Sequence, residues 1–315
     1  MPQQTGPITV SVTNFVEAES DRMFAGLAAT AGGSNRWIHH RAPAPLDNQV
    51  VIRMNRDTLY SSAIVDLSQG ATLTVPEHGD RYLSVMVVNE HHHINRLFHE
   101  AGVYELTVDE FDTPWVLVAA RILVDPDNPD DVAEVNRIQD GFVIESAGGA
   151  EFVYPDYDEA TLDATRAPLL ELSRGLSDFS AAFGREDQVD PVRHLLGTAS
   201  GWGGLPEEEA TYLNFDGLPF VDHELVMRDV PVDSFWSVSV YNGDGFFEPN
   251  ERGVNTVNSV TSVKEADGST IVRFGSGDAP NTIPIMEGWN YVVRLYRPRP
   301  EVLDGSWTLP EAQPR

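Results

Sequence analysis

The chain has 315 residues, which is long for a single hydrophobic core and predicts two domains. It contains no cysteine, so disulfides, thiolate catalysis, iron–sulfur clusters and cysteine-ligated zinc are excluded. The formal net charge of -28 repels phosphate backbones and anionic lipids, which argues against nucleic-acid and membrane-surface partners.

Lys264 is the only lysine, and every other basic residue is an arginine. An acidic surface with almost no lysine suits high salt, where screening removes self-repulsion, so we predict that the fold is stabilised by salt. No apolar segment reaches the roughly 20 residues of a membrane helix, and the N-terminus lacks the pattern of a signal peptide. We therefore expect a cytoplasmic protein.

The N-terminal part is predicted to form one helix followed by short strands. Asn14 is expected to cap the helix, with Glu17 completing a capping box and Gly32 ending it. The β-prone runs that follow are 64–67, 71–75, 82–88, 103–108 and 115–124. Several short strands separated by turn residues favour a sandwich or jelly roll.

Helical spacing returns in the middle of the chain. We predict helices over 131–141 and 162–183, the second ended by Gly184, with Pro168 marking an irregular turn or the true helix start. A third helix is expected after Asp190, with Pro191 in its first turn. The later β-prone runs are 224–230, 235–241, 257–263, 270–274 and 291–296.

These elements predict a mainly β, α+β fold, with two β-sandwich or jelly-roll-like modules and a helical segment between them. We place a β-rich N-terminal domain, preceded by its helix, at 1–140 and a helical connection at 141–220. A C-terminal β-sandwich domain is placed at 221–315. No glycine-rich dinucleotide or Walker motif is present, so nucleotide binding has no support.

A polar cluster, R-M-N-R-D-T-L-Y, occupies 53–60 directly after the apolar run 50–52. On an extended chain Arg53, Asn55 and Asp57 share one face. Arginine and aspartate beside an apolar strand indicate either a site that binds a carboxylate or phosphate, or a buried network that fixes strand register.

Glu90 is followed by three histidines, 91–93. On an extended chain His91 and His93 point to the same side, at a spacing that allows both imidazoles to bind one metal ion. His39 and His40 form a second pair. The structural alternative is that these histidines line a polar edge.

A glycine-rich turn with one tryptophan, Trp202, follows the helix expected at Pro191. Its glycines allow close packing, and Trp202 is expected to close the core or to line a ligand site.

Separated motifs resemble a known pair of domains. Residues 53–66 are similar to the signature of the domain of unknown function numbered twelve fifty-four, and 229–241, 281–285, 288–298 and 303–307 resemble its usual companion, numbered twelve fourteen. The resemblance spans about 35–312 and implies two β-sandwich or jelly-roll modules with helices between them. Similar members carry Asn-Glu-Asp-His-Tyr where this chain has 89–93, so only His92 matches the family histidine, which weakens the pairing of His91 with His93.

Our first hypothesis is an enzyme of hydrolase type that acts on a small polar or anionic molecule. Arg56 would orient an acidic group, Asp57 or His92 would act as general acid–base, and Tyr60 would donate a hydrogen bond. Arg53, Asn55 and Trp202 would line the ligand site.

One divalent metal ion, held by His40, His92 and an acid such as Asp57, would supply an activated water. The alternative class is a non-catalytic protein that binds carbohydrate or another ligand, or that builds an assembly, with Trp202, Phe246 and Phe247 as an exposed platform. A homo-oligomer is compatible with either hypothesis.

Overall fold

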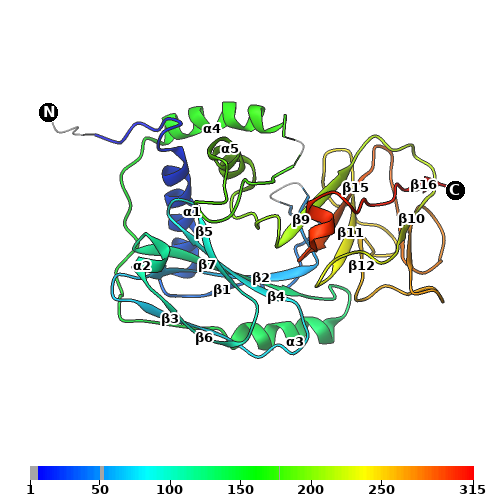
Figure 1. Ribbon diagram of the computed structural model, residues 1–315, viewed down its shortest axis with the longest axis horizontal. Coiled ribbons are helices and arrows are strands. Elements are labelled where there is room, and N and C mark those ends of the chain that lie inside the picture. Colours follow the sequence, from blue (N-terminus) through cyan, green and yellow to red (C-terminus); the bar gives the residue numbers. More distant parts are fainter. Residues whose placement is uncertain (1–5, 50–52, 177) are drawn as a thin grey trace. The chain divides into compact units, whose positions relative to one another are not determined.

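The computed structural model describes residues 6–49, 53–176 and 178–315. Figure 1 shows the chain, which divides into two compact units built from interleaved segments. Unit 1 comprises Met1–Arg41, Tyr60–Ile122 and Glu134–Pro206, and unit 2 comprises Ala42–Leu59, Leu123–Ala133 and Glu207–Arg315. The apolar run 50–52 lies outside the described residues, and the domain boundaries at 140 and 220 stay a prediction.

The first helix, α1, spans Phe15–Ala31 and ends at Gly32, whose φ of 73° is the left-handed conformation that glycine adopts without strain. This end was predicted correctly. Asn14 occupies the N-cap position, but its side chain makes no cap hydrogen bond. Its Oδ1 instead accepts a 2.8 Å bond from the backbone N–H of Ser11, so the predicted capping box is wrong.

Two further helices pack with α1 in unit 1: α4, Glu159–Ser173, and α5, Pro191–Gly201 (Figure 1). Helix α5 starts as predicted, because Asp190 accepts hydrogen bonds from the backbone N–H groups of Val192 and Arg193. Helix α4 ends at Ser173, well before Gly184, and Pro168 lies inside it. The predicted helix is therefore confirmed up to Ser173, but its predicted end at Gly184 and the predicted role of Pro168 are wrong.

The strands of unit 1 form two antiparallel sheets, ordered β1-β2-β7-β4-β5 and β6-β3-β8. Strands β2 and β7 run into unit 2 at one end. Their bounds are β1 Ile38–His39, β2 Thr58–Asp66, β3 Ala71–Val75, β4 Leu83–Asn89, β5 Ile94–Phe98, β6 Gly102–Leu106, β7 Trp115–Leu123 and β8 Val143–Ser146. The short helices α2, Val108–Phe111, and α3, Pro129–Asp140, complete this part, and α3 has residues in both units.

Unit 2 has two four-stranded sheets, ordered β14-β13-β10-β16 and β12-β11-β15-β9. Side chains from both sheets, such as Val272 and Val293, share one buried core, so the unit is a sandwich. The bounds are β9 Ala210–Phe215, β10 His223–Met227, β11 Trp236–Tyr241, β12 Thr256–Asn258, β13 Thr270–Phe274, β14 Thr282–Ile283, β15 Asn290–Tyr296, α6 Pro300–Leu303 and β16 Gln313–Pro314.

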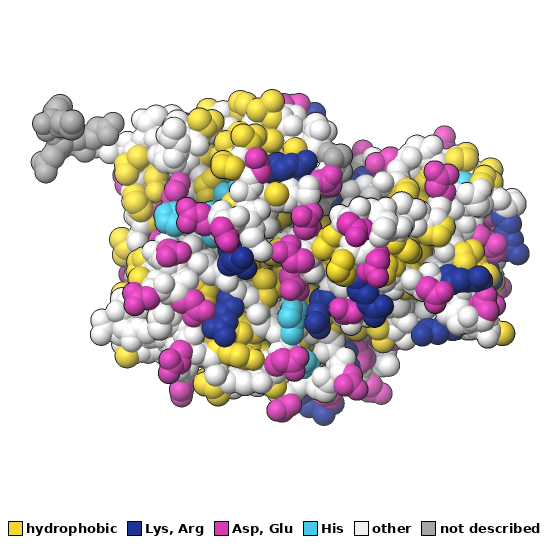
Figure 2. Space-filling view, viewed as in Figure 1, with side chains coloured by type: hydrophobic (Ala, Val, Ile, Leu, Met, Phe, Trp, Pro, Cys, Tyr) yellow, Lys and Arg dark blue, Asp and Glu magenta, His cyan; other side chains and the backbone are white. Residues whose placement is uncertain are grey.

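The predicted fold class is confirmed: the chain is mainly β, with sandwich-like modules and helices added to them. Among the residues described, no helix combines the length and the apolar character needed to cross a bilayer. Acidic side chains are spread over the face of the molecule drawn in Figure 2, as the net charge requires.

Candidate functional site

The polar signature at 53–60 builds a buried network in unit 2. Asp57 is 1% exposed, and its Oδ2 accepts a 2.6 Å hydrogen bond from Ser237 Oγ on β11. Arg294 on β15 is 3% exposed and donates to Ser239 Oγ, to Tyr241 Oη and to the backbone oxygen of Arg53. Burial raises the pKa of Asp57, although the nearby charge of Arg294 and the Ser237 bond act to lower it.

The other signature side chains in unit 2 are also held by the chain itself. Arg53 Nη2 forms a 2.9 Å ion pair with Asp216. Asn55 Nδ2 donates to Tyr296 Oη at 2.8 Å, and its Oδ1 accepts from the backbone N–H of Asp57. Arg56 Nη1 donates to the backbone oxygen of Ala44, and burial lowers the pKa of Arg56 despite the nearby charge of Asp127. This arrangement favours the buried-network interpretation of the signature.

Tyr60 and His40 belong to unit 1. Tyr60 lies on β2, with the guanidinium of Arg121 5.5 Å from its ring centroid, and Arg121 Nη2 donates to the backbone oxygen of Gly203. His40 has an exposed side chain, and its backbone N–H donates to the Tyr60 backbone oxygen at 2.9 Å.

His92 is fully buried in unit 1 with both ring nitrogens bonded inside the protein. Its Nε2 accepts a 2.9 Å hydrogen bond from the backbone N–H of Gly203, so its proton must lie on Nδ1, which donates to Thr198 Oγ1 at 2.8 Å. Burial, with His194 and His93 nearby, holds the pKa of His92 well below its ordinary value. This geometry makes His92 a neutral structural histidine.

A stack of aromatic rings extends from His92 in both directions. The indole of Trp202 lies parallel to the imidazole of His92 at 5.1 Å and 9°, and His194 stacks on the other side at 5.4 Å. His93 continues the stack, 5.0 Å from His194. Trp202 is half-buried in this stack, and Phe247 is only 2% exposed, so the expected exposed platform of Trp202, Phe246 and Phe247 is wrong.

The described residues do not support the metal hypothesis. Over 6–49, 53–176 and 178–315, no three or more histidine, aspartate or glutamate side chains are placed to hold a metal ion. Both ring nitrogens of His92 are bonded inside the protein. The rings of His91 and His93 lie 6.2 Å apart, but His91 Nδ1 is 3.3 Å from Glu17 Oε1 and His93 stacks on His194.

A pair of carboxyl groups lies beside this stack in unit 1. Asp21 on α1 is 3% exposed, and Glu90 and Tyr157 lie close enough to influence the pKa of its carboxyl. Glu90 follows β4 and is half-buried, and its backbone N–H donates to the hydroxyl oxygen of Thr113 at 3.3 Å. His91 and Glu17, both partly exposed, border the pair on its open side.

The two carboxyl groups lie close enough to affect each other's proton affinity. Asp21 Oδ1 is buried and has no hydrogen-bond partner among the described residues. Burial, followed by the charge of Glu90, raises the pKa of Asp21 to about 7. Burial also raises the pKa of Glu90, and it raises that of Tyr157 to about 12, so Tyr157 stays a hydrogen-bond donor. A group that titrates near neutrality suits acid–base catalysis.

Sequence reasoning named His92 and Trp202 but missed Asp21 and assigned no role to Glu90. One signal was available. Glu17 and Asp21 are four positions apart in a helix, so two like charges occupy one helical face, which is unfavourable unless one is neutralised. Histidine atoms lie beside acidic side chains in Figure 2 over the region where Figure 1 labels α1.

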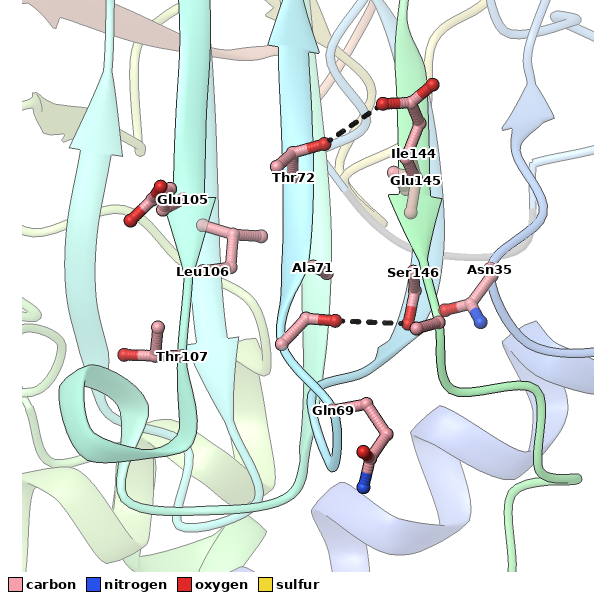
Figure 3. A pocket seen from close by; sticks show the side chains of 12 residues that line it. Asn35, Gln69, Ala71, Thr72, Glu105, Leu106, Thr107, Ile144, Glu145 and Ser146 are labelled. Carbon is pink, nitrogen blue, oxygen red and sulfur yellow. Dashed lines mark hydrogen bonds between the residues drawn. The ribbon is translucent and has the colours of Figure 1, made fainter.

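A hollow of about 650 Å³ on the sheet β6-β3-β8 is a weaker candidate (Figure 3). Thr72 pairs with Glu105 on one side and Glu145 on the other, so the three side chains form a row across the sheet. Both glutamates are exposed, and Thr72 Oγ1 donates to Glu145 at 3.5 Å. This row is a solvated sheet face.

Comparison with sequence families now gives two matches. Residues 34–95 match the family described as "Protein of unknown function (DUF1254)", and residues 221–300 match "Protein of unknown function (DUF1214)". The chain therefore carries a segment similar to each of these two families. This confirms the predicted resemblance. The DUF1254 match contains Asp57, Glu90 and His92 and the DUF1214 match contains Arg294, whereas Asp21 and Trp202 lie outside both matches.

Solved structures extend the comparison to the fold. The crystal structure of the VPA0106 protein from Vibrio parahaemolyticus aligns with a TM-score of 0.76 at 16% identity, covering 96% of this chain and 97% of that one. An uncharacterized protein from Burkholderia cenocepacia aligns with a TM-score of 0.47 at 12% identity, covering 96% and 87%. No curated protein matches the chain. The Vibrio protein therefore shares the fold of this chain.

Proposed function

We propose that the protein is a hydrolase that acts on a small polar molecule by acid–base catalysis, with Asp21 and Glu90 as the reacting pair. The observation that carries the proposal is the closeness of these two carboxyl groups, one nearly fully buried and the other half-buried, so that the charge of Glu90 adds to burial in raising the pKa of Asp21. Such a pair supplies an acid and a base at the same pH, because neighbouring carboxyls do not both ionise readily.

Each group has a distinct part in the reaction. The carboxylate of Glu90 takes a proton from a water molecule that adds to an acyl or acetal carbon of the substrate. The carboxyl of Asp21 gives its proton to the leaving oxygen or nitrogen, so the bond breaks without release of a strong base. The hydroxyl of Tyr157, which lies near Asp21 and acts to lower its pKa, stabilises the carboxylate that this step leaves behind.

The surrounding charges favour a neutral or cationic substrate. Glu17 borders the pair, Asp112 adds a further negative charge near His91, and His91 is bonded to Glu17. An anionic molecule would be repelled here. The predicted anion-binding role of Arg56 concerns unit 2 and stays a prediction, as do a catalytic role for Asp57 or Tyr60, a cytoplasmic location and a homo-oligomer.

The test is hydrolysis of a panel of neutral chromogenic esters, amides and glycosides by the full chain and by three variants. Glu90→Gln and Asp21→Asn each remove one carboxyl from the pair, and Glu105→Gln removes an exposed carboxyl from another part of unit 1. We expect one class of substrate to be cleaved, with kcat/KM falling at least roughly 100-fold in the first two variants, because general acid–base groups contribute about 10²–10⁴-fold. Glu105→Gln should match the wild type.

Activity that survives both Glu90→Gln and Asp21→Asn would overturn the assignment of the pair. An intact protein that cleaves nothing in the panel would overturn the hydrolase proposal.

A further inference from the structure

The two carboxyls of the pair are attached to the same aromatic stack by separate connections. Glu90 and His92 belong to one tight turn, in which Asn89 Oδ1 accepts hydrogen bonds from the backbone N–H groups of His91 and His93. His92 adopts a positive φ of 60° at the centre of this turn. The buried imidazole of His92 therefore fixes the segment that carries Glu90.

The connection to Asp21 runs through Trp202. Its Nε1 donates a 3.2 Å hydrogen bond to the Oγ of Ser20, the residue before Asp21 on α1. One helical turn further on, Phe24 packs edge-on against the same indole, with ring centroids 6.1 Å apart. Trp202 thus contacts α1 at two positions that flank Asp21 in the sequence.

The two connections meet where Trp202 stacks on His92. Because the indole and the imidazole are parallel and in contact, a displacement of either ring would move the turn that carries Glu90 relative to α1. The ring of His92 is held in turn by Thr198 on α5 and by Gly203, next to Trp202. The stack is therefore a rigid bridge between the two reacting side chains.

We propose that His92 and Trp202 are positioning residues, which hold Glu90 close to Asp21 through the chain His92–Trp202–Ser20. This inference rests on the proposed function for its catalytic meaning. It gives His92, which matches the family histidine, and the glycine-rich turn that carries Trp202 a common role. Together they set the distance between the carboxyls of Asp21 and Glu90, and this distance affects the proton affinity of both groups.

The proposal predicts an effect on proton affinity that overall destabilisation would not produce. Trp202→Phe keeps an aromatic ring on His92 but loses the N–H that binds Ser20, and Ser20→Ala removes the acceptor while keeping a good helix former. Trp37→Phe is the matched control, because the Trp37 Nε1 in the same unit is buried without a partner among the described residues.

The measurement is the ¹³C chemical shift of the Asp21 carboxyl in the full-length protein against pH, assigned by its loss in Asp21→Asn. In the wild type we expect a pKa of about 7 for Asp21. In Trp202→Phe and Ser20→Ala we expect the midpoint to fall by about one pH unit or more, because Glu90 moves away, whereas Trp37→Phe should keep the wild-type midpoint.

An unchanged midpoint in both Ser20→Ala and Trp202→Phe would overturn the positioning role and leave the proposed function intact. A midpoint that fell equally in Trp37→Phe would also overturn it, since the effect would then be general. A wild-type midpoint near the ordinary value for aspartate would instead overturn the proposed function itself.

Discussion

Ser237 Oγ donates a 2.6 Å hydrogen bond to Asp57 Oδ2 across 180 positions of the sequence. The two residues come from the DUF1254 and DUF1214 matches, so this bond joins segments of the two families within unit 2. Arg294 supplies a positive charge near Asp57. Burial alone would lower the pKa of Arg294, but Tyr241, Tyr296 and Asp57 together raise it above its ordinary value. The network is thus a buried pair of opposite charges, and its integrity should matter for stability.

We predict that Asp57→Ala destabilises the protein by about 3–5 kcal/mol, because it leaves the buried charge of Arg294 uncompensated. Urea denaturation at pH 7 measures the change. The control is Asp216→Ala, which breaks the partly exposed ion pair with Arg53 in the same unit and should cost about 0–1 kcal/mol. Equal effects of the two changes would refute the view of the signature as a buried network.

Asp21 makes the opposite contribution, because its carboxyl is destabilising when ionised. Its pKa rises from 3.8 in the unfolded chain to about 7 in the folded protein, so the folded state binds more protons and stability falls as the pH rises between these values. The shift corresponds to roughly 4 kcal/mol. We expect Asp21→Asn to stabilise the protein at pH 8 by about 2–4 kcal/mol, and to lose this advantage towards pH 4.

Chemical denaturation at the two pH values tests this prediction, with Asp80→Asn as an exposed control in the same unit. A variant less stable than the wild type at pH 8 would show that the ionised Asp21 is favourable in the fold, contrary to the carboxyl-pair interpretation.

Strands with simple alternation were predictable from the sequence, whereas strands that bury polar residues were not. The bounds predicted at 71–75 and 270–274 coincide with β3 and β13, where buried and less buried positions alternate. Strand β2 begins at Thr58, before the predicted 64, because its polar residues are buried by tertiary bonds such as that from Gln139 Nε2 to Ser61 Oγ. Such partners are distant in sequence and leave no local periodicity.

Helix α4 was predicted too long, whereas strand β2 was predicted too short. Leu172 has the spacing of a buried residue, yet it is 65% exposed, and the helix ends one residue later. Leucine spacing alone did not reveal where the chain leaves the helix.

Only part of the candidate site could be predicted from the sequence, because some of its residues are brought together by the fold alone. Glu90 and His92 lie in a motif that the family resemblance picked out. Asp21 was missed because an acid on a helix ordinarily faces solvent, and its burial depends on Glu90 and Tyr157, which only the fold brings to it.

His92 predicts a loss of stability in acid. Its pKa in the folded protein lies well below the ordinary 6.5, so the unfolded chain binds the extra proton first as the pH falls. The free energy of unfolding should therefore fall below about pH 6.5, by up to about 1.4 kcal/mol per pH unit for this one proton. His92→Phe should remove this part of the pH dependence.

The same variant should also cost about 2–4 kcal/mol at pH 7.5, because it leaves the Gly203 N–H and the Thr198 hydroxyl without their partner. Urea denaturation at pH 7.5 and 5.5 gives both quantities. His40→Gln is the control, since that side chain is exposed. A pH dependence unchanged in His92→Phe would mean that His92 does not stay neutral in the folded protein.

The charge balance predicts that salt stabilises the whole protein. With 49 acidic and 21 basic residues, repulsion between carboxylates outweighs ion pairs such as Arg228–Asp267, which is exposed and therefore screened by water and salt. Raising NaCl to about 1 M shortens the Debye length to roughly 3 Å and removes most of this repulsion. We expect Tm to rise by about 5 °C, which corresponds to roughly 1–2 kcal/mol in a chain of this size.

The control is sucrose at equal osmolality, which is excluded from the protein surface but does not screen charge. If Tm stays constant in NaCl, or rises equally in sucrose, the excess negative charge is not what limits stability.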